Sequence, residues 1–237
     1  MIEIVSIILL FIITITLKII LNVKFKELNK LSKEKQLDYL TERLPENEKI
    51  CKEILKKLNN ETVKINKSLD ENSQTSLYMV WGNKIILANN NKSYARVQTV
   101  AHECLHSIQS KKMLWFNYVF SNFYIIYTAV VLILTITGII KNSLLQLYIL
   151  SILGLVFYVV RSFLEIDAMT KAKFLAVDYL ESTEKYNKEE INILKNEYEK
   201  INKIGIPTTC FVLAFNVIKK LLIYSVVAII LLIVKSL

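Results

Sequence analysis

Apolar residues are gathered in four long blocks, and charged residues lie almost entirely between them. The blocks cover residues near 4–22, 113–140, 143–160 and 208–234. Each is close to, or longer than, the roughly 20 residues that an α-helix needs to cross the hydrocarbon core of a bilayer. Only four Gly and two Pro occur in 237 residues, which favours long helices. The pattern therefore predicts a mainly α integral membrane protein, with helical transmembrane segments separated by charged, water-exposed parts.

The first block predicts a transmembrane anchor over residues 1–22. It starts without Lys or Arg, its apolar region is longer than that of a cleavable signal peptide, and no small-residue cleavage site follows it. The two blocks within residues 113–160 are separated only by Lys141 and Asn142. So short a break predicts a transmembrane helical hairpin with a tight loop.

The last block, within residues 208–237, contains Lys219 and Lys220. A lysine at the centre of a span costs about 3 kcal/mol on insertion scales. We therefore expect the span itself to begin near Leu221, with residues 208–218 at the membrane interface or against the soluble part. The segment is either an interfacial helix or a full transmembrane helix.

Positive charge is distributed unevenly along the chain and indicates an orientation. Of the 30 Lys and Arg residues, 17 lie in residues 23–112 and 8 in residues 161–207. One span before the first stretch and a hairpin between the two place both stretches on one side, which the positive-inside rule makes cytoplasmic. The spans therefore predict a multi-pass protein of the cell membrane with the lipid bilayer as a partner, and the net charge of +9 indicates attraction to anionic lipid. Because the lysines alternate with glutamates and no nucleic-acid motif occurs, we expect no nucleic-acid partner.

Residues 23–112 predict a small cytoplasmic α+β part. Hydrophobic periodicity, turn residues and a serine N-cap indicate its elements. These are a helix over 24–60 interrupted at Pro45, β-like runs over 61–65 and 83–89, and a helix from Ser93 to Gln109.

Residues 161–207 predict a cytoplasmic helical part. The helix that leaves the hairpin is expected to continue, and the sequence NKEE at 187–190 opens another helix with an N-cap and a glutamate three residues later. Gly205 and Pro207 are expected to stop that helix near Ile204.

The stretch VQTVAHECLHSIQS, residues 97–110, contains both histidines of the chain. On a helix, His102 and His106 share a face, so both imidazoles can bind one metal ion. Glu103 lies about 100° around the helix, where its carboxylate can reach a water molecule rather than the metal. A zinc peptidase needs this geometry, because zinc activates a water while the glutamate acts as general base. The alternative is a solvated pair of histidines on an amphipathic helix.

A catalytic zinc site needs three protein ligands, and the chain has no third histidine. A carboxylate is the natural candidate. Glu165 and Asp167 follow the predicted hairpin directly, on the side of the membrane where the histidines are expected. Cys104 is two residues from each histidine, so a helix turns it away from the ligands. Three widely spaced cysteines predict no disulfide framework.

Two segments resemble a known family. TVAHECLHSIQ is similar to the A-A-H-E-V-G-H-A-I-Q stretch of the membrane-bound neutral zinc metallopeptidases of the YugP type, and LEIDAMTKAKFLAVDYLE resembles their E-F-D-A-S-R-R-A-L segment. The resemblance implies a zincin-like metalloprotease module with one zinc ion per chain. It implies that His102, His106 and Glu165 are the zinc ligands and that Glu103 is the catalytic base. It also implies that Asp167 orients a ligand histidine.

Other features of such a site have weaker candidates. Leu105 stands where the family has glycine, which leaves less room beside the metal. A zinc peptidase usually provides a donor to the oxyanion, for which Arg161, Tyr78 and Tyr179 are candidates. The strand over 83–89 could pair at its edge with a substrate backbone, or be an ordinary sheet strand.

The leading interpretation is a membrane-embedded zinc-dependent endopeptidase whose catalytic part lies on the cytoplasmic face. Its expected substrate is a membrane-associated or unfolded polypeptide. The alternatives are a non-catalytic membrane scaffold or immunity-type protein that retains a zinc site, and hydrolysis of a small non-peptide substrate. Glu103 favours an enzyme, because a structural metal site has no need of a base there.

Overall fold

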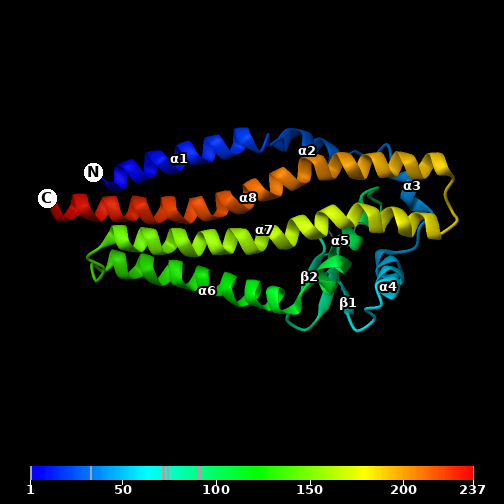
Figure 1. The fold of residues 1–237 in the computed structure, drawn as a ribbon, viewed down its shortest axis with the longest axis horizontal. Coiled ribbons are helices and arrows are strands. Elements are labelled where there is room, and N and C mark those ends of the chain that lie inside the picture. Colours follow the sequence, from blue (N-terminus) through cyan, green and yellow to red (C-terminus); the bar gives the residue numbers. More distant parts are fainter. Residues whose placement is uncertain (1, 33, 71–72, 74, 90–91, 237) are drawn as a thin grey trace. The chain divides into compact units, whose positions relative to one another are not determined.

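The computed structural model of the chain describes residues 2–32, 34–70, 73, 75–89 and 92–236. The protein is 74% helical, with one small three-stranded sheet, which confirms the mainly α class (Figure 1). The elements are α1 (Ile2–Ile20), α2 (Phe25–Ser32), α3 (Tyr39–Glu42), α4 (Asn47–Lys57), β1 (Lys64–Lys67), β2 (Leu77–Met79), β3 (Lys84–Leu87), α5 (Arg96–Ile108), α6 (Lys111–Ile136), α7 (Ser143–Ser182) and α8 (Lys188–Ser236).

The chain divides into two compact units. The first, which we call the apolar unit, consists of Met1–Val23, Phe116–Phe163 and Pro207–Leu237. The second, which we call the polar unit, consists of Lys24–Trp115 and Leu164–Ile206. Both α7 and α8 are long enough to contribute one part to each unit.

Three helices of the described chain, α6, α7 and α8, are long and apolar enough to cross a membrane. The segment of α1 qualifies only together with α2, as a pair bent by 50°. Large apolar side chains on these helices stay exposed, for example Ile126 at 62% and Ile152 at 64%. Soluble proteins seldom expose so much contiguous apolar surface, so these helices have the character of membrane spans.

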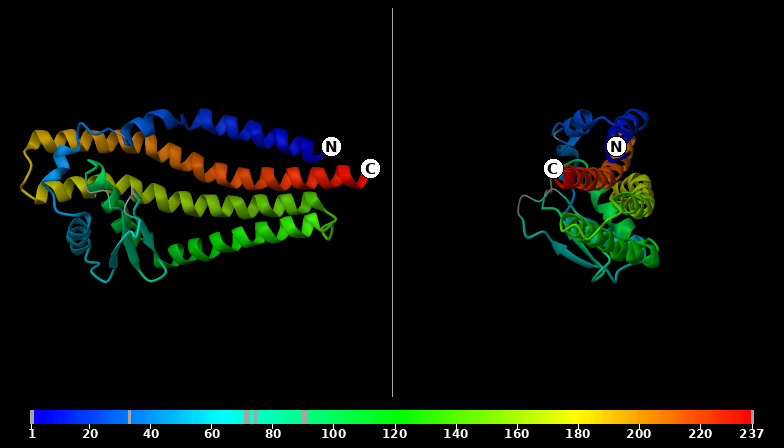
Figure 2. Two further views of the ribbon diagram at one scale, coloured as in Figure 1. Left: turned by 180° about the vertical axis from the view of Figure 1, so that it is seen from behind. Right: turned by 90° about the vertical axis from the view of Figure 1, so that its left-hand side faces the viewer.

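The apolar unit has its own packed core. Tyr124 and Val131 of α6, Leu150 of α7, and Val217 and Tyr224 of α8 form one buried cluster. Helices α6 and α7 lie antiparallel within it, joined by a short loop that both viewing directions show (Figures 1 and 2). The predicted hairpin and the last apolar block therefore pack together.

The hairpin loop has a local explanation in the sequence. Gly138 adopts φ +77°, a conformation that costs glycine little, and its N–H donates to Thr135 O at 3.0 Å. On the other side of the loop, Asn142 Oδ1 accepts a hydrogen bond from Leu145 N at 3.0 Å and caps α7. The chain thus turns away from α6 at Gly138. The sequence had predicted the break slightly later, at Lys141 and Asn142.

The expected helix stop at Gly205 and Pro207 is wrong, because α8 continues through both residues to Ser236. Tertiary packing outweighs the local signals. A Cβ built on Gly205 would lie 3.1 Å from Met169 Cε, so glycine permits a close approach between α8 and α7. One turn earlier, Asn202 Nδ2 donates to Met169 O at 2.8 Å. Proline inside long helices is tolerated where neighbouring groups stabilise the packing.

The sheet of the polar unit has the order β1-β3-β2. β1 pairs with β3 in parallel, and β2 pairs with β3 antiparallel, with Tyr78 opposite Ile85. β3 is therefore the central strand and is paired on both sides. Of the two interpretations left open for the strand over 83–89, the structure therefore favours the ordinary sheet strand over a free edge for a substrate. The edge strand next to α5 is β2, for which the sequence had suggested no strand.

Helix α5 packs against α4 and against strands β2 and β3. Its first residue, Arg96, is only 4% exposed. The Arg96 guanidinium donates to Thr41 O at 2.7 Å, Leu44 O at 3.1 Å and Pro45 O at 2.9 Å. These carbonyls lie at the end of α3 and in the turn after it, so Arg96 ties the start of α5 to the turn that leads into α4.

Candidate metal centre

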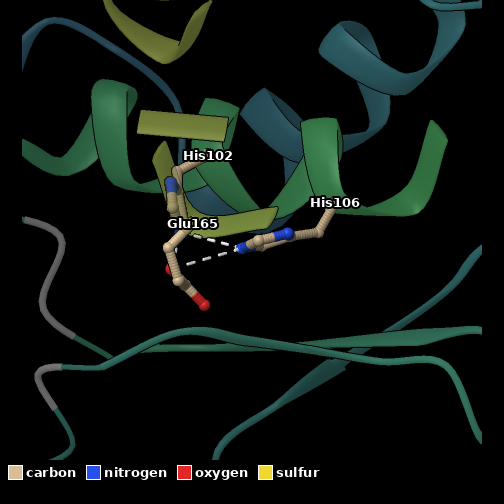
Figure 3. Close-up of side chains that lie close together, drawn as sticks. All are labelled: His102, His106 and Glu165. Atoms are coloured by element: carbon tan, nitrogen blue, oxygen red, sulfur yellow. Dashed lines mark hydrogen bonds and ion pairs between the residues drawn. The ribbon is translucent and has the colours of Figure 1, made fainter. Parts of the chain in front are cut away.

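Three side chains with metal-binding atoms converge in the polar unit. His102 and His106 project from α5, and Glu165 projects toward them from α7 (Figure 3). The two imidazole Nε2 atoms are 3.0 Å apart. Glu165 Oε2 lies 3.4 Å from His102 Nε2 and 3.7 Å from His106 Nε2. The structure thus brings together the three residues that the sequence suggested as ligands.

The separations fit a metal ion. Around a tetrahedral ion with bonds of about 2.0–2.1 Å, neighbouring ligand atoms are about 3.3 Å apart, and the three observed separations bracket that distance. All three atoms carry lone pairs that a shared cation could accept as a metal ligand set. The cluster could therefore hold a metal ion with two nitrogen ligands and one oxygen ligand.

The histidines share a face because they are four residues apart on α5, and the opposite face of the helix is buried. Ala101 and Cys104 on that face are fully buried, and Cys104 Sγ lies 3.6 Å from Cys51 Sγ of α4. Both thiols are free. Cys104 is therefore a packing residue that keeps the other face of α5 toward the cluster.

Glu103 lies beside the cluster without belonging to it. Its side chain is 7% exposed, and its Oε1 is 3.9 Å from His102 Nε2. Its other oxygen, Oε2, accepts a hydrogen bond from the backbone N–H of Tyr78 in the edge strand β2. The strand thus holds the carboxylate in place at the side of the histidine pair.

Burial and neighbouring charge shift two pKa values at the site. Burial raises the pKa of Glu103 above its ordinary value, although both imidazoles and the N–H of Tyr78 offset part of the effect. Burial by itself lowers the pKa of His106, but Glu165, Glu103 and Gln109 together raise it, so that the net shift is upward. A carboxylate with a raised pKa is a better proton acceptor, which suits a general base.

Gln109, three residues after His106, is a part of the site that the sequence did not suggest. His106 Nδ1 lies 2.8 Å from Gln109 Oε1. Gln109 Nε2 donates to Leu164 O and to Asp167 Oδ2, both at 2.9 Å. The sequence signals for it were its position at the end of the histidine helix and its match to the last residue of the quoted family stretch, but its partners on α7 could not be predicted.

Asp167 was expected to orient a ligand histidine. Its carboxylate instead accepts a hydrogen bond from Gln109 Nε2 and pairs with Lys171 Nζ, which lies 2.5 Å from Asp167 Oδ1. Burial tends to raise the pKa of Asp167, but the hydrogen bonds from Gln109 and Lys171 hold it below its ordinary value. Asp167 therefore stays a carboxylate and reaches His106 through Gln109.

Of the three candidate oxyanion donors, Tyr78 and Tyr179 have hydroxyl groups that contact other side chains. The Tyr78 hydroxyl is 2.9 Å from Asn83 Oδ1 and from Lys111 Nζ. The Tyr179 hydroxyl donates to Glu53 Oε2 at 2.7 Å. Arg161 belongs to the apolar unit and precedes Glu165 by four residues on α7. An oxyanion role for any of them stays a prediction.

No protein-family model, curated protein or solved structure matches this chain. The resemblance to zinc metallopeptidases of the YugP type thus stays a prediction.

Proposed function

We propose that the protein is a membrane-embedded zinc-dependent endopeptidase. The observation that carries the proposal is the convergence of His102, His106 and Glu165, with the buried carboxylate of Glu103 beside them. Two imidazoles and one carboxylate are a common ligand set of catalytic zinc. We propose with it a zincin-like module, as the resemblance to the YugP-type metallopeptidases implies.

Three protein ligands favour catalysis over a structural role. Structural zinc sites are closed by four protein ligands, whereas catalytic sites keep one position for water or substrate. Among the described residues, the cluster consists of three ligand groups. Glu103 Oε1 lies 3.9 Å from His102 Nε2, and the other oxygen of Glu103 accepts a hydrogen bond from the edge strand rather than from the cluster.

Each residue has a defined task in the proposed reaction. A bound zinc ion would supply Lewis acidity, which activates water and polarises the scissile carbonyl. His102, His106 and Glu165 hold the ion from two helices. Glu103 accepts a proton from the attacking water at its carboxylate and delivers it to the nitrogen of the leaving amine. Its burial supports this task, because it raises the pKa of the carboxyl group.

We further propose that the protein crosses the cell membrane several times with the polar unit in the cytoplasm. The support is the position of 25 of the 30 Lys and Arg residues in 23–112 and 161–207. A peptidase at that surface would meet polypeptides that are bound to the membrane or unfolded near it. These are the substrates we propose.

The proposal is tested by the Glu103→Gln variant of the full chain in detergent. We expect it to cleave unfolded protein substrates at least about 100-fold more slowly than the wild type, because the general base is lost. Glu181→Gln is the matched control, since it makes the same change at an exposed position of α7 and should keep the wild-type rate. Equal cleavage by wild-type and Glu103→Gln proteins would contradict the peptidase proposal and favour a non-catalytic scaffold.

A further inference from the structure

Gln109 occupies the position where the histidine helix ends. It is the C-cap of α5, and its backbone N–H donates to His106 O at 3.3 Å. Beyond it the chain turns toward α6, which begins at Lys111. The Gln109 side chain points back to α5 through its carbonyl oxygen and across to α7 through its amide nitrogen.

The partners of Gln109 determine which way its amide faces. An amide nitrogen only donates hydrogen bonds, and a carbonyl oxygen only accepts them. Leu164 O and Asp167 Oδ2 are both acceptors, so the Gln109 nitrogen must face them. The Gln109 oxygen then faces His106 Nδ1, which has to be the donor. In the neutral imidazole that binds a metal ion, His106 Nε2 is thereby left with a lone pair directed at the cluster.

The same side chain joins the two helices that carry the cluster. Leu164 immediately precedes Glu165, and Asp167 follows it by two residues. The two hydrogen bonds from Gln109 therefore fix the segment of α7 that presents the Glu165 carboxylate. Lys171 Nζ, one turn further along α7, lies 2.5 Å from Asp167 Oδ1 and holds that side chain in place.

We propose that Gln109 is the positioning residue of the metal centre. It sets the tautomer of His106 and fixes the distance between the histidine helix and Glu165, while Asp167 and Lys171 hold its amide in the required orientation. This inference rests on the metal binding proposed above. Groups that orient metal ligands in this way typically change metal affinity by about 10- to 100-fold when they are removed.

The first test is the affinity of the full chain in detergent for Zn²⁺, measured by competition with a chromophoric chelator. We expect Gln109→Leu to bind Zn²⁺ about 10- to 100-fold more weakly than the wild type. Gln98→Leu is the matched control. Gln98 also lies on α5, and its amide donates to Asn202 Oδ1 of α8 at 2.8 Å. The control should keep the wild-type affinity, because its bridge lies outside the cluster.

A second pair of variants separates positioning from folding. Gln109→Glu keeps an acceptor for His106 but loses both donors and places a second carboxylate against Asp167, so we expect weaker Zn²⁺ binding. Adding Asp167→Asn restores a donor opposite residue 109. We expect the double variant to recover the wild-type affinity or exceed it, which a general packing defect would not do.

The outcomes distinguish this proposal from the proposed function. If the wild type binds Zn²⁺ and Gln109→Leu binds it equally tightly, the positioning role is overturned while the metal centre stands. A double variant that binds as weakly as Gln109→Glu would also overturn the role. If the wild type binds no Zn²⁺, the proposed function fails, and this inference fails with it.

Discussion

At the scale of single residues, Arg96 determines how the histidine helix begins. Its guanidinium is buried and satisfies three backbone carbonyls, those of Thr41, Leu44 and Pro45. A fourth contact, at 3.1 Å, is to Asn47 Oδ1. No spacing rule of a helix or strand predicts such a contact, because its acceptors lie about 50 residues earlier in the chain.

We expect Arg96→Leu to lower the free energy of unfolding of the polar unit by about 3 kcal/mol or more. The reason is that each buried carbonyl left without a donor costs about 1–3 kcal/mol. The change is measured as a lower denaturation midpoint in detergent. Arg43→Leu is the control, since Arg43 has a side chain that is 44% exposed and pairs with Glu190 at the surface. If the two variants unfolded at the same midpoint, Arg96 would not have the role described here.

The candidate site shows what local sequence can predict at this scale. The spacing of His102 and His106 places both on one face of a helix whatever the tertiary fold, so the sequence alone was sufficient to predict the pair. The place of Glu165 depended on the hairpin and on the family resemblance. The bridge through Gln109 joins groups 55 or more residues apart, so only the folded chain reveals it.

At the scale of elements, close packing between helices determines whether a helix continues where local signals predict that it ends. Gly205 and Pro207 would end an isolated helix, yet α8 continues because it packs closely against Met169 of α7. Gly154 of α7 has a similar role in the apolar unit. A Cβ built there would lie 2.3 Å from Val217 Cγ1 and 2.8 Å from the Tyr124 hydroxyl. Small residues of this kind let helices in membranes approach closely.

We therefore expect Gly154→Val to destabilise the apolar unit. The added side chain has to displace Val217 and Tyr124, and overpacking of this kind costs about 1–3 kcal/mol. The thermal unfolding midpoint of the detergent-solubilised chain should fall. Ile152→Val on the same helix is the control, because Ile152 is 64% exposed. An unchanged midpoint for Gly154→Val would mean that the helices are not packed as described.

At the scale of the whole molecule, the sequence divides into apolar and charged stretches, and the folded chain divides into two units. The apolar unit has no Asp or Glu in residues 116–163 or 207–237. Block lengths and composition were sufficient to predict the mainly helical class and the hairpin. They were not sufficient to predict strand β2, whose three residues are too few for a periodic signal.

The orientation has a direct test. We expect a reporter inserted after Lys141, in the loop between α6 and α7, to map outside the cell. The positive-inside rule requires this, because the loop has one lysine while the flanking polar stretches have 25 Lys and Arg residues. A second reporter at Glu184, in the turn between α7 and α8, should map to the cytoplasm. A cytoplasmic signal from the first reporter would contradict the proposed topology.

The zinc content of the purified chain tests the central claim most directly. We predict about one zinc ion per chain for the wild type and for Glu103→Gln, because Glu103 contributes no ligand. We predict its loss in His102→Ala and in Glu165→Ala, because two remaining ligands bind zinc weakly. The exposed Glu181 of α7 provides the control variant, Glu181→Ala, which should keep its zinc. Full zinc occupancy in Glu165→Ala, or none in the wild type, would contradict the account.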